Sequence, residues 1–197
     1  MKIGILGGTF DPVHQGHLLL ARAAQKQFSL AKVLFIPAFI PPHKTKRRDL
    51  TPAPYRYRMV EMAVGGEPGF EISDLELNRP DVSYTVDTLR ALKKKYPGDD
   101  LFLIFGADTL AEVSGWREPA EIRRLAGFLA ASRPAFGLPA ALPGEVSWID
   151  MPACPISSSA IREAVRQGRP LGKDFLPPAV EGYIRRMKLY GTDRPCR

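Results

Sequence analysis

Two histidines three residues apart, His14 and His17, have the spacing and side-chain chemistry to act on a phosphate. They follow a double glycine, Gly7-Gly8, which comes directly after the apolar run at 3–6 and precedes a helical pattern over 18–28. A glycine-rich turn between a strand and a helix directs backbone N–H groups into one space, where the helix dipole adds partial positive charge. We therefore expect a phosphate site at this turn, with both imidazoles at its mouth as hydrogen-bond donors.

The amino-acid sequence of the turn does not match either of two common phosphate-binding motifs. A P-loop closes on Gly-Lys-Ser/Thr, whereas this stretch closes on Gly16-His17-Leu18. The dinucleotide motif G-x-G-x-x-G does not fit glycines at positions 4, 7 and 8. Two alternatives stay open: an incidental pair of helix-start histidines, and a metal site in which Asp11 is a third ligand. The metal site does not account for the double glycine, so we favour phosphate chemistry.

The rest of the chain has the pattern of an α/β protein. Strand-like runs cover residues 3–6, 32–36, 70–72, 101–105, 127–132 and 146–149, and helical runs cover 18–28, 53–64, 119–125 and 178–190. Short strand–helix–strand connections predict right-handed parallel units and a doubly wound parallel sheet. We expect a single domain over 1–197, with the sheet core at 1–150 and a small helical C-terminal part at 151–197.

Polar residues follow several of these elements. Residues 37–54 are expected to form an irregular loop at the carboxyl end of a strand, where open α/β sheets bind ligands. In this loop His43 and Lys44 are placed to reach a triphosphate, whereas Lys46 to Arg48 fit a solvated surface. Ser83 is expected to cap the following helix.

A second anion site is predicted near the C-terminus. The hydroxyls at 157–159 begin a helix with Arg162 one turn further on, although capping alone needs only one serine. Asp108, just past the strand at 101–105, has three alternative roles: a ribose acceptor, a metal ligand or a helix cap.

Composition limits the class of protein. The chain has 45% hydrophobic and 25% charged residues, a net charge of +7 and a pI near 9.6, which favours an anionic partner. No signal peptide is evident and no apolar run approaches the roughly 20 residues that span a bilayer, so a cytoplasmic protein is expected. Cys154 and Cys196 have no metal or redox spacing and are expected to be free thiols.

The two outer motifs resemble known signatures. Gly7 to His17 resembles the T/HxGH signature of nucleotidyltransferases, and Ile156 to Arg162 resembles their second signature, ISSTxxR. The intervening series is similar to that of bacterial nicotinate-nucleotide adenylyltransferases. Its members are Pro41-Pro42-His43-Lys44, Arg56 with Met59, Ser83-Tyr84-Thr85 followed by Thr88-Leu89, Gly106-Ala107-Asp108-Thr109-Leu110, Trp116 and Ser132-Arg133-Pro134. Phosphopantetheine adenylyltransferases lack this middle series.

The resemblance, which runs from Lys2 to Tyr190, implies a Rossmann-like fold and a reaction. The reaction is transfer of AMP from ATP to nicotinate mononucleotide, with Mg²⁺, giving deamido-NAD and pyrophosphate in NAD biosynthesis. His14 and His17 would be catalytic. The ATP-binding residues would be Gly8, Thr9, Phe10, His14, His17, Ser157, Ser159 and Arg162. The acceptor-binding residues would be Lys44, Thr85, Asp108, Trp116, Arg117 and Arg133. No metal would be bound by the protein itself, because Mg²⁺ comes with the ATP phosphates.

Three alternatives remain at this point. Arg117 stands where the family pattern favours an aromatic residue, and it could pair with the nicotinate carboxylate or point to solvent. The acceptor could be nicotinamide mononucleotide or another phosphorylated molecule. A non-catalytic nucleotide or nucleic-acid binder is the rival from another class, for which Tyr55-Arg56-Tyr57-Arg58 is the only aromatic and basic run. Nucleic-acid and membrane partners are not expected, and a homodimer is left open.

Overall fold

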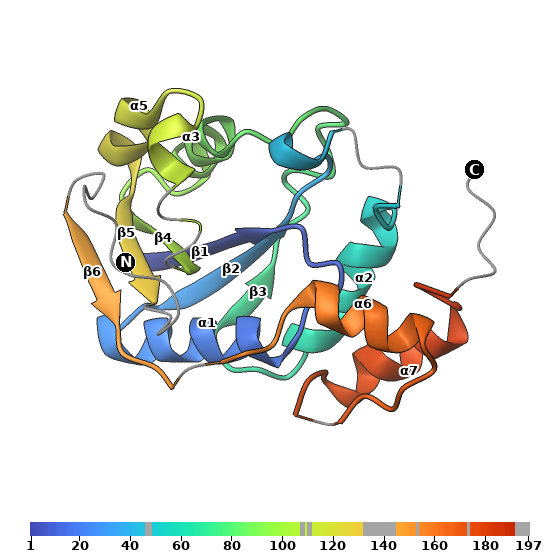
Figure 1. Cartoon of the computed structure of the whole chain (residues 1–197). Coiled ribbons are helices and arrows are strands. Elements are labelled where there is room, and N and C mark those ends of the chain that lie inside the picture. The colour runs from blue at the N-terminus through green and yellow to red at the C-terminus, as the bar shows by residue number, and fades with distance from the viewer. Residues whose placement is uncertain are drawn as a thin grey trace.

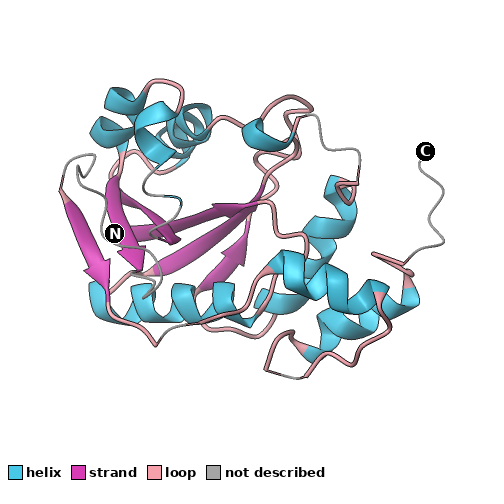
Figure 2. Ribbon diagram, in the orientation of Figure 1, coloured by secondary structure: helices cyan, strands magenta, loops and turns pink. Residues whose placement is uncertain are grey.

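The computed structural model describes residues 1–45, 49–106, 109, 112–131, 145–152, 154–172 and 174–191. Within these residues, six parallel strands form one sheet in the order β3-β2-β1-β4-β5-β6 (Figure 2). The strands are β1 (Lys2–Gly8), β2 (Lys32–Pro37), β3 (Phe70–Ile72), β4 (Asp100–Gly106), β5 (Gly127–Ala131) and β6 (Val146–Ile149). The predicted α/β class and doubly wound sheet are confirmed.

Helices cover both faces of the sheet (Figure 1). On one face lie α1 (Gln15–Phe28) and α2 (Ala53–Val64), joined by α6 (Ser158–Arg166) and α7 (Pro178–Arg186) from the C-terminal part. On the other face lie α3 (Thr85–Lys95) and α5 (Pro119–Leu125). Two short 3₁₀ helices, η1 (Pro42–Lys44) and η2 (Val113–Gly115), lie in the connections after β2 and β4.

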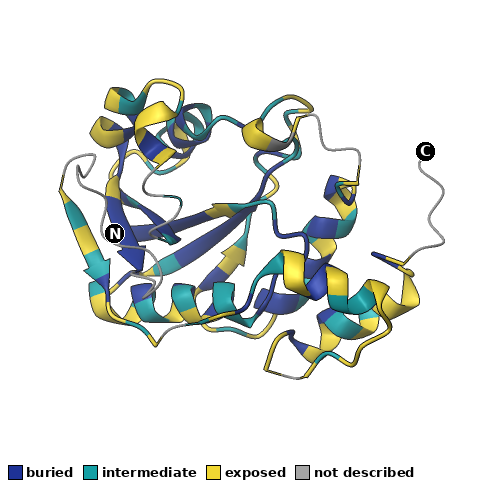
Figure 3. Cartoon of the chain, viewed as in Figure 1, coloured by how far each residue is buried: buried dark blue, intermediate teal, exposed yellow. Residues whose placement is uncertain are grey.

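Each face of the sheet has its own core because side chains alternate along a strand. In β1, Leu6 packs into the core under α1 and α2, while Ile3 and Ile5 pack into the core under α3 and α5. In β2, Phe35 packs into the core under α1 and α2, and Leu34 packs into the core under α3 and α5. Burial on both faces is the reason that these strands read as continuous apolar runs, and they are dark blue in Figure 3.

The structure corrects three details of the expected elements. The helix expected over 178–190 ends at Arg186, before the left-handed backbone at Lys188 and Tyr190. α1 begins at Gln15, not at residue 18, so His14 is its N-cap residue. Ser83 does not cap α3: the N-cap is Tyr84, and the Ser83 hydroxyl instead accepts a hydrogen bond of 2.9 Å from the Phe39 N–H. The Ser83 hydroxyl therefore bonds to a loop residue 44 positions earlier in the chain and not to the start of α3.

The strand order determines where a ligand can bind. β1 lies between β2 and β4, and the chain leaves β1 toward one side of the sheet and β4 toward the other. The connections that follow these two strands diverge, which opens a crevice at their carboxyl ends. No helix in the described ranges is both long and apolar enough to cross a bilayer.

Candidate active site

A cavity of about 900 Å³ opens at the carboxyl ends of β1 and β4. Its wall combines three parts of the chain that are distant in sequence. The N-terminal turn contributes Gly7, Gly8, Thr9, His14 and His17; the middle of the chain contributes Thr85, Trp116 and Arg117; the C-terminal part contributes Ser157 and Ser158. The histidines come from the face of the sheet that carries α1, whereas Thr85 and Trp116 come from the face that carries α3, so the two groups of residues form two ends of the cavity.

The two histidines are held together by the start of α1. The His14 N–H donates a hydrogen bond of 3.2 Å to Nδ1 of His17, and the ring centroids lie 3.8 Å apart. Because Nδ1 accepts this bond, the proton of a neutral His17 ring is on Nε2. His17 therefore presents a hydrogen-bond donor at Nε2 without needing a positive charge.

The surroundings of Gly16 and Gly7 explain why neither position carries a side chain. A Cβ on Gly16 would lie 3.0 Å from Sγ of Cys154 and 3.1 Å from the His14 ring, so a side chain there would displace the histidine. A Cβ on Gly7 would meet nothing within 4 Å and would project into the cavity instead. The absence of a side chain at position 7 thus leaves room for a ligand to approach the backbone.

Phe10 packs between the turn and the core of the protein. Its ring is buried, lies edge-to-face with His17 at 5.1 Å between centroids, and contacts Phe35 at 6.0 Å. Its backbone is in the left-handed region, with φ 50°, which costs a residue of this kind roughly 1–3 kcal/mol. The contacts of the buried ring with Phe35 and His17 offset that strain.

Arg56 holds the same turn and was not predicted to do so. Its guanidinium is fully buried and donates to three carbonyl oxygens, of Thr9 and Thr51 at 2.7 Å and of Phe39 at 2.9 Å. Burial lowers the pKa of Arg56, and the nearby Asp11 carboxylate opposes that shift. An interior arginine cannot contact a nucleic acid, which removes the aromatic and basic run at 55–58 as a binding face.

The C-terminal serines divide between two tasks. Ser157 caps α6 by accepting a bond of 3.1 Å from the Ala160 N–H, and both Ser157 and Ser158 line the cavity. Among the described residues, the cavity wall includes neither Ser159 nor Arg162. Arg162 is buried and donates to the Asp11 carbonyl at 2.7 Å and to the Ser159 hydroxyl at 3.1 Å. Direct phosphate binding by this pair stays a prediction.

The other end of the cavity is built on α3 and η2. Thr85 is the first residue of α3, so the N–H groups and positive dipole end of that helix are at the wall. Trp116 directly follows η2 and stands edge-on to Phe105, with 6.4 Å between ring centroids. An aromatic wall beside a helix N-terminus suits a flat ring that carries an anionic group.

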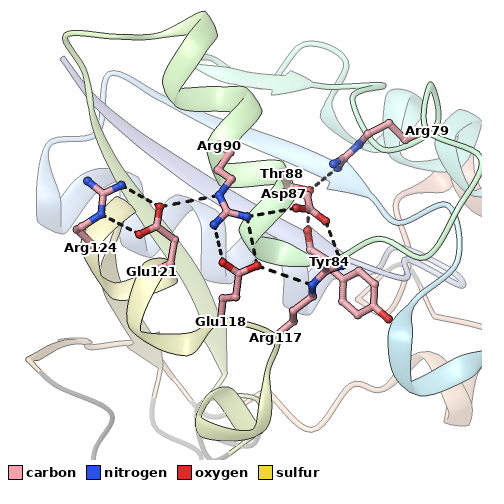
Figure 4. A network of polar contacts seen from close by, with 9 residues as sticks. All are labelled: Arg79, Tyr84, Asp87, Thr88, Arg90, Arg117, Glu118, Glu121 and Arg124. Atoms are coloured by element: carbon pink, nitrogen blue, oxygen red, sulfur yellow. Dashed lines mark hydrogen bonds and ion pairs between the residues drawn. The ribbon is translucent and has the colours of Figure 1, made fainter.

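Arg117 lies at the rim of this end, in the network of Figure 4. Its guanidinium is 3.8 Å from Asp87 and 3.8 Å from Glu118, and lies over the Tyr84 ring at 4.9 Å. The side chain is 55% exposed and still lines the cavity. Arg117 is therefore a charge-compensated rim residue, and neither of the two sequence alternatives describes it fully.

A buried carboxyl group lies beside the same end of the cavity. Glu76 is 7% exposed, lines the cavity and accepts a bond of 2.6 Å from the Thr88 hydroxyl. The Thr88 hydroxyl in turn accepts a bond of 2.8 Å from Arg79 (Figure 4). Burial raises the pKa of Glu76, and the bonds from Thr88 and Ser83 partly oppose that shift. Sequence reasoning missed Glu76 because it lies in a segment without a regular pattern.

Several predicted residues cannot be placed in the site. Asp108 and Arg133 lie outside the described residues, as do Lys46 to Arg48. The backbone of Lys44 lies in η1, and His43 beside it lines the cavity. Within the described ranges, no three His, Cys, Asp or Glu side chains are grouped as a metal site would require.

Comparisons with known proteins agree with this geometry. The model of the cytidylyltransferase-like family matches residues 5–164. A probable nicotinate-nucleotide adenylyltransferase of Desulfitobacterium hafniense is 44% identical over 200 residues, covering 96% of this chain and 95% of that protein. One of Thermus thermophilus is 44% identical over 190 residues, covering 96% and 100%.

A solved structure is similar in fold. The nicotinic acid mononucleotide adenylyltransferase of Plasmodium falciparum, complexed with NaAD, superposes with a TM-score of 0.81 at 20% identity, covering 96% of this chain and 97% of that one. Its complex with APC gives 0.79. The family match and the close relatives together show that this chain belongs to the cytidylyltransferase-like family, among the nicotinate-nucleotide adenylyltransferases.

Proposed function

We propose that this chain transfers the adenylyl group of ATP to nicotinate mononucleotide, releasing deamido-NAD and pyrophosphate. The observation that carries the proposal is the pair His14 and His17 at one end of a cavity whose other end is an aromatic wall at a helix N-terminus. The names of the relatives, and a fold neighbour bound to NaAD, support the same substrates. NAD biosynthesis is the process that this reaction serves.

The chemistry needs alignment and charge stabilisation more than it needs a base. The attacking group is a phosphate monoester, mostly dianionic at neutral pH because its second pKa is about 6. It can attack the α-phosphate directly, so neither proton abstraction nor a covalent enzyme intermediate is required. What remains is to hold two anions in line and to stabilise the charge that grows on the α-phosphate and on the leaving pyrophosphate.

The ATP half of the site would use the N-terminal turn and the start of α6. Nε2 of His17, with the His14 ring beside it, would donate to the phosphate oxygens that gain charge. Backbone N–H groups at the turn would cradle the nucleotide. The ATP-contacting set that we propose is Gly8, Thr9, Phe10, His14, His17, Ser157, Ser159 and Arg162.

The acceptor half would use α3 and η2. The nicotinate carboxylate would lie at the N-terminus of α3, near Thr85, with the pyridine ring against Trp116 and Arg117 at the rim. A site made of N–H donors and an arginine favours an anionic carboxylate over a neutral amide. Lys44, Asp108 and Arg133 complete the proposed acceptor set and rest on the sequence resemblance alone.

Magnesium is proposed to enter as part of the substrate. The groups around the triphosphate end of the cavity are imidazoles, hydroxyls and backbone N–H groups, whereas Mg²⁺ prefers carboxylate, phosphate and water oxygens. The phosphates of ATP supply such oxygens, and the histidines are left to bind the remaining phosphate oxygens. A cytoplasmic location and a homodimer stay predictions.

A pyrophosphate-release assay with Mg-ATP tests the function directly. Purified chain is given nicotinate mononucleotide, nicotinamide mononucleotide or phosphopantetheine in parallel, and the dinucleotide product is identified by mass. We expect release with nicotinate mononucleotide, weaker release with nicotinamide mononucleotide and none with phosphopantetheine. Release with phosphopantetheine alone, or tight oligonucleotide binding with no release at all, would overturn the proposal.

A further inference from the structure

The catalytic turn is held from the C-terminal side of the chain. The Ser158 hydroxyl donates to the Pro12 carbonyl at 2.9 Å, and Arg162 donates to the Asp11 carbonyl at 2.7 Å. The Gln15 N–H, at the start of α1, donates to the Phe175 carbonyl at 3.0 Å. The backbone on both sides of His14 is therefore fixed by residues that come more than 140 positions later in the chain.

The Asp11 side chain is buried at the centre of these contacts. Its carboxylate is 1% exposed and accepts a bond of 2.8 Å from the Tyr190 hydroxyl and one of 3.4 Å from the Thr51 N–H. The charge of Arg56 acts on the same carboxylate. A buried carboxylate is tolerated only when its oxygens are hydrogen-bonded and its charge is compensated, so each of these partners constrains where Asp11 can lie.

Tyr190 reaches Asp11 from beyond the end of α7. The residue is 7% exposed, its hydroxyl lies 3.9 Å from Sδ of Met59 in α2, and its backbone has φ 66°. Burial and the Asp11 charge raise the pKa of the Tyr190 hydroxyl far above its usual value, so the hydroxyl stays a donor at every working pH. A left-handed backbone at a tyrosine is costly, and the surrounding contacts must over-determine it.

We propose that Tyr190 is a positioning residue for adenylyl transfer: its hydroxyl orients the Asp11 carboxylate and thereby fixes the turn that carries His14 and His17. The inference rests on the proposed function, because it assigns a role within that reaction. It goes beyond that function in making the C-terminal segment part of the catalytic machinery. Loss of the hydroxyl would let the turn shift, and a misplacement of about 1 Å can already cost up to about 10²-fold in rate.

Tyr190→Phe tests the proposal, with Tyr183→Phe as the matched control. Tyr183 is a partly buried tyrosine of α7. Its substitution by phenylalanine also removes one hydroxyl oxygen, but at a position that does not bond to Asp11. We expect kcat of Tyr190→Phe to fall about tenfold while both KM values stay within about twofold, since misplacement of catalytic groups acts on the transition state. Rates are divided by the folded fraction from circular dichroism, so partial unfolding cannot imitate the loss.

A double-mutant cycle separates positioning from a general structural effect. In a His17→Ala background, Tyr190→Phe should lower kcat by less than about threefold, because one of the two histidines that it positions is already gone. Additive losses in the cycle, or wild-type kcat in Tyr190→Phe, would overturn the inference while leaving the proposed function intact. Failure of the wild-type chain to release pyrophosphate would instead overturn the proposed function.

Discussion

The His14 backbone N–H and the His17 ring are joined by the bond that also begins α1, with 3.2 Å between the nitrogen and Nδ1. His17 consequently has two separable tasks. Nδ1 satisfies an N–H at the helix start, where no helical carbonyl is available to accept it. Nε2 carries the proton that we propose is donated to the phosphates. Substitutions that keep one task and remove the other can therefore distinguish stability from catalysis.

His17→Ala removes both tasks, whereas His17→Asn keeps an acceptor oxygen close to the place of Nδ1. We expect both variants to lose about 10²–10³ in kcat, the scale for one transition-state donor. Only the alanine variant should also lose about 0.5–2 kcal/mol in the free energy of unfolding, the scale for a lost cap. Pyrophosphate release and urea unfolding measure the two effects. Turnover near wild type in either variant would refute the catalytic role of His17.

Arg117→Ala should weaken the preference for nicotinate over nicotinamide mononucleotide. Removal of the guanidinium takes one of two positive charges from Asp87 and Glu118, both 3.8 Å from it and both also paired with Arg90. The rim becomes more negative and repels the nicotinate carboxylate. Because the side chain is largely exposed, we expect KM for nicotinate mononucleotide to rise only about two- to fivefold. The effect should shrink with added salt.

The control for Arg117 lies in the same network. Arg124 pairs with Glu121 on the far side of α5 and is not part of the cavity wall among the described residues (Figure 4). Arg124→Ala should leave both KM values unchanged. An unchanged acceptor preference in Arg117→Ala would assign recognition of the carboxylate to the N-terminus of α3 alone.

The sheet and the catalytic turn were predictable from sequence because their signals are local. Apolar runs bounded by turns locate the strands, and Gly7-Gly8 followed by His14 and His17 locates the phosphate turn. The start of α1 was predicted three residues late, since a histidine is an unusual N-cap residue. The sequence pattern therefore predicted that the two glycines and the two histidines lie near the end of β1. It did not predict the hydrogen bond between His14 and His17.

Arg56 and Glu76 could not be predicted because their environments are made by distant segments. Arg56 finds acceptors at Thr9, Phe39 and Thr51, and no local pattern shows that three carbonyls converge there. In the local sequence, Arg56 is only one of two arginines that alternate with tyrosines over residues 55–58. Arg162 has the same ambiguity: its spacing from the serines fits a ligand contact, while its guanidinium bonds the Asp11 carbonyl.

The raised pKa of Glu76 predicts a pH-dependent stability. A carboxyl whose pKa is higher in the folded than in the unfolded chain stabilises the fold while protonated, and that contribution is lost as the pH rises through the folded value. The loss begins near the unfolded pKa, roughly 4.3. Glu76→Gln keeps an oxygen acceptor for Thr88 and cannot ionise. Its Tm relative to wild type should therefore increase between about pH 4.5 and pH 7.5.

The exposed Glu145 gives the control for this experiment. Glu145→Gln should show a Tm difference from wild type that does not depend on pH, because an exposed carboxyl pays no burial cost. A constant difference for Glu76→Gln across the same range would contradict the assignment of Glu76 as a buried carboxyl that ionises at a cost.

Arg56 and Arg58, two residues apart on α2, make the sharpest stability test. Arg56→Met leaves three carbonyl oxygens without their donor in the interior, and one of them, of Thr9, belongs to the catalytic turn. We expect the free energy of unfolding to fall by about 3–5 kcal/mol, as when one partner is removed from a buried charged group. Arg58→Met loses only an exposed pair with Glu61 and should stay within about 0.5 kcal/mol of wild type. Urea unfolding measures both. Equal losses in the two variants would show that the three carbonyls do not depend on Arg56.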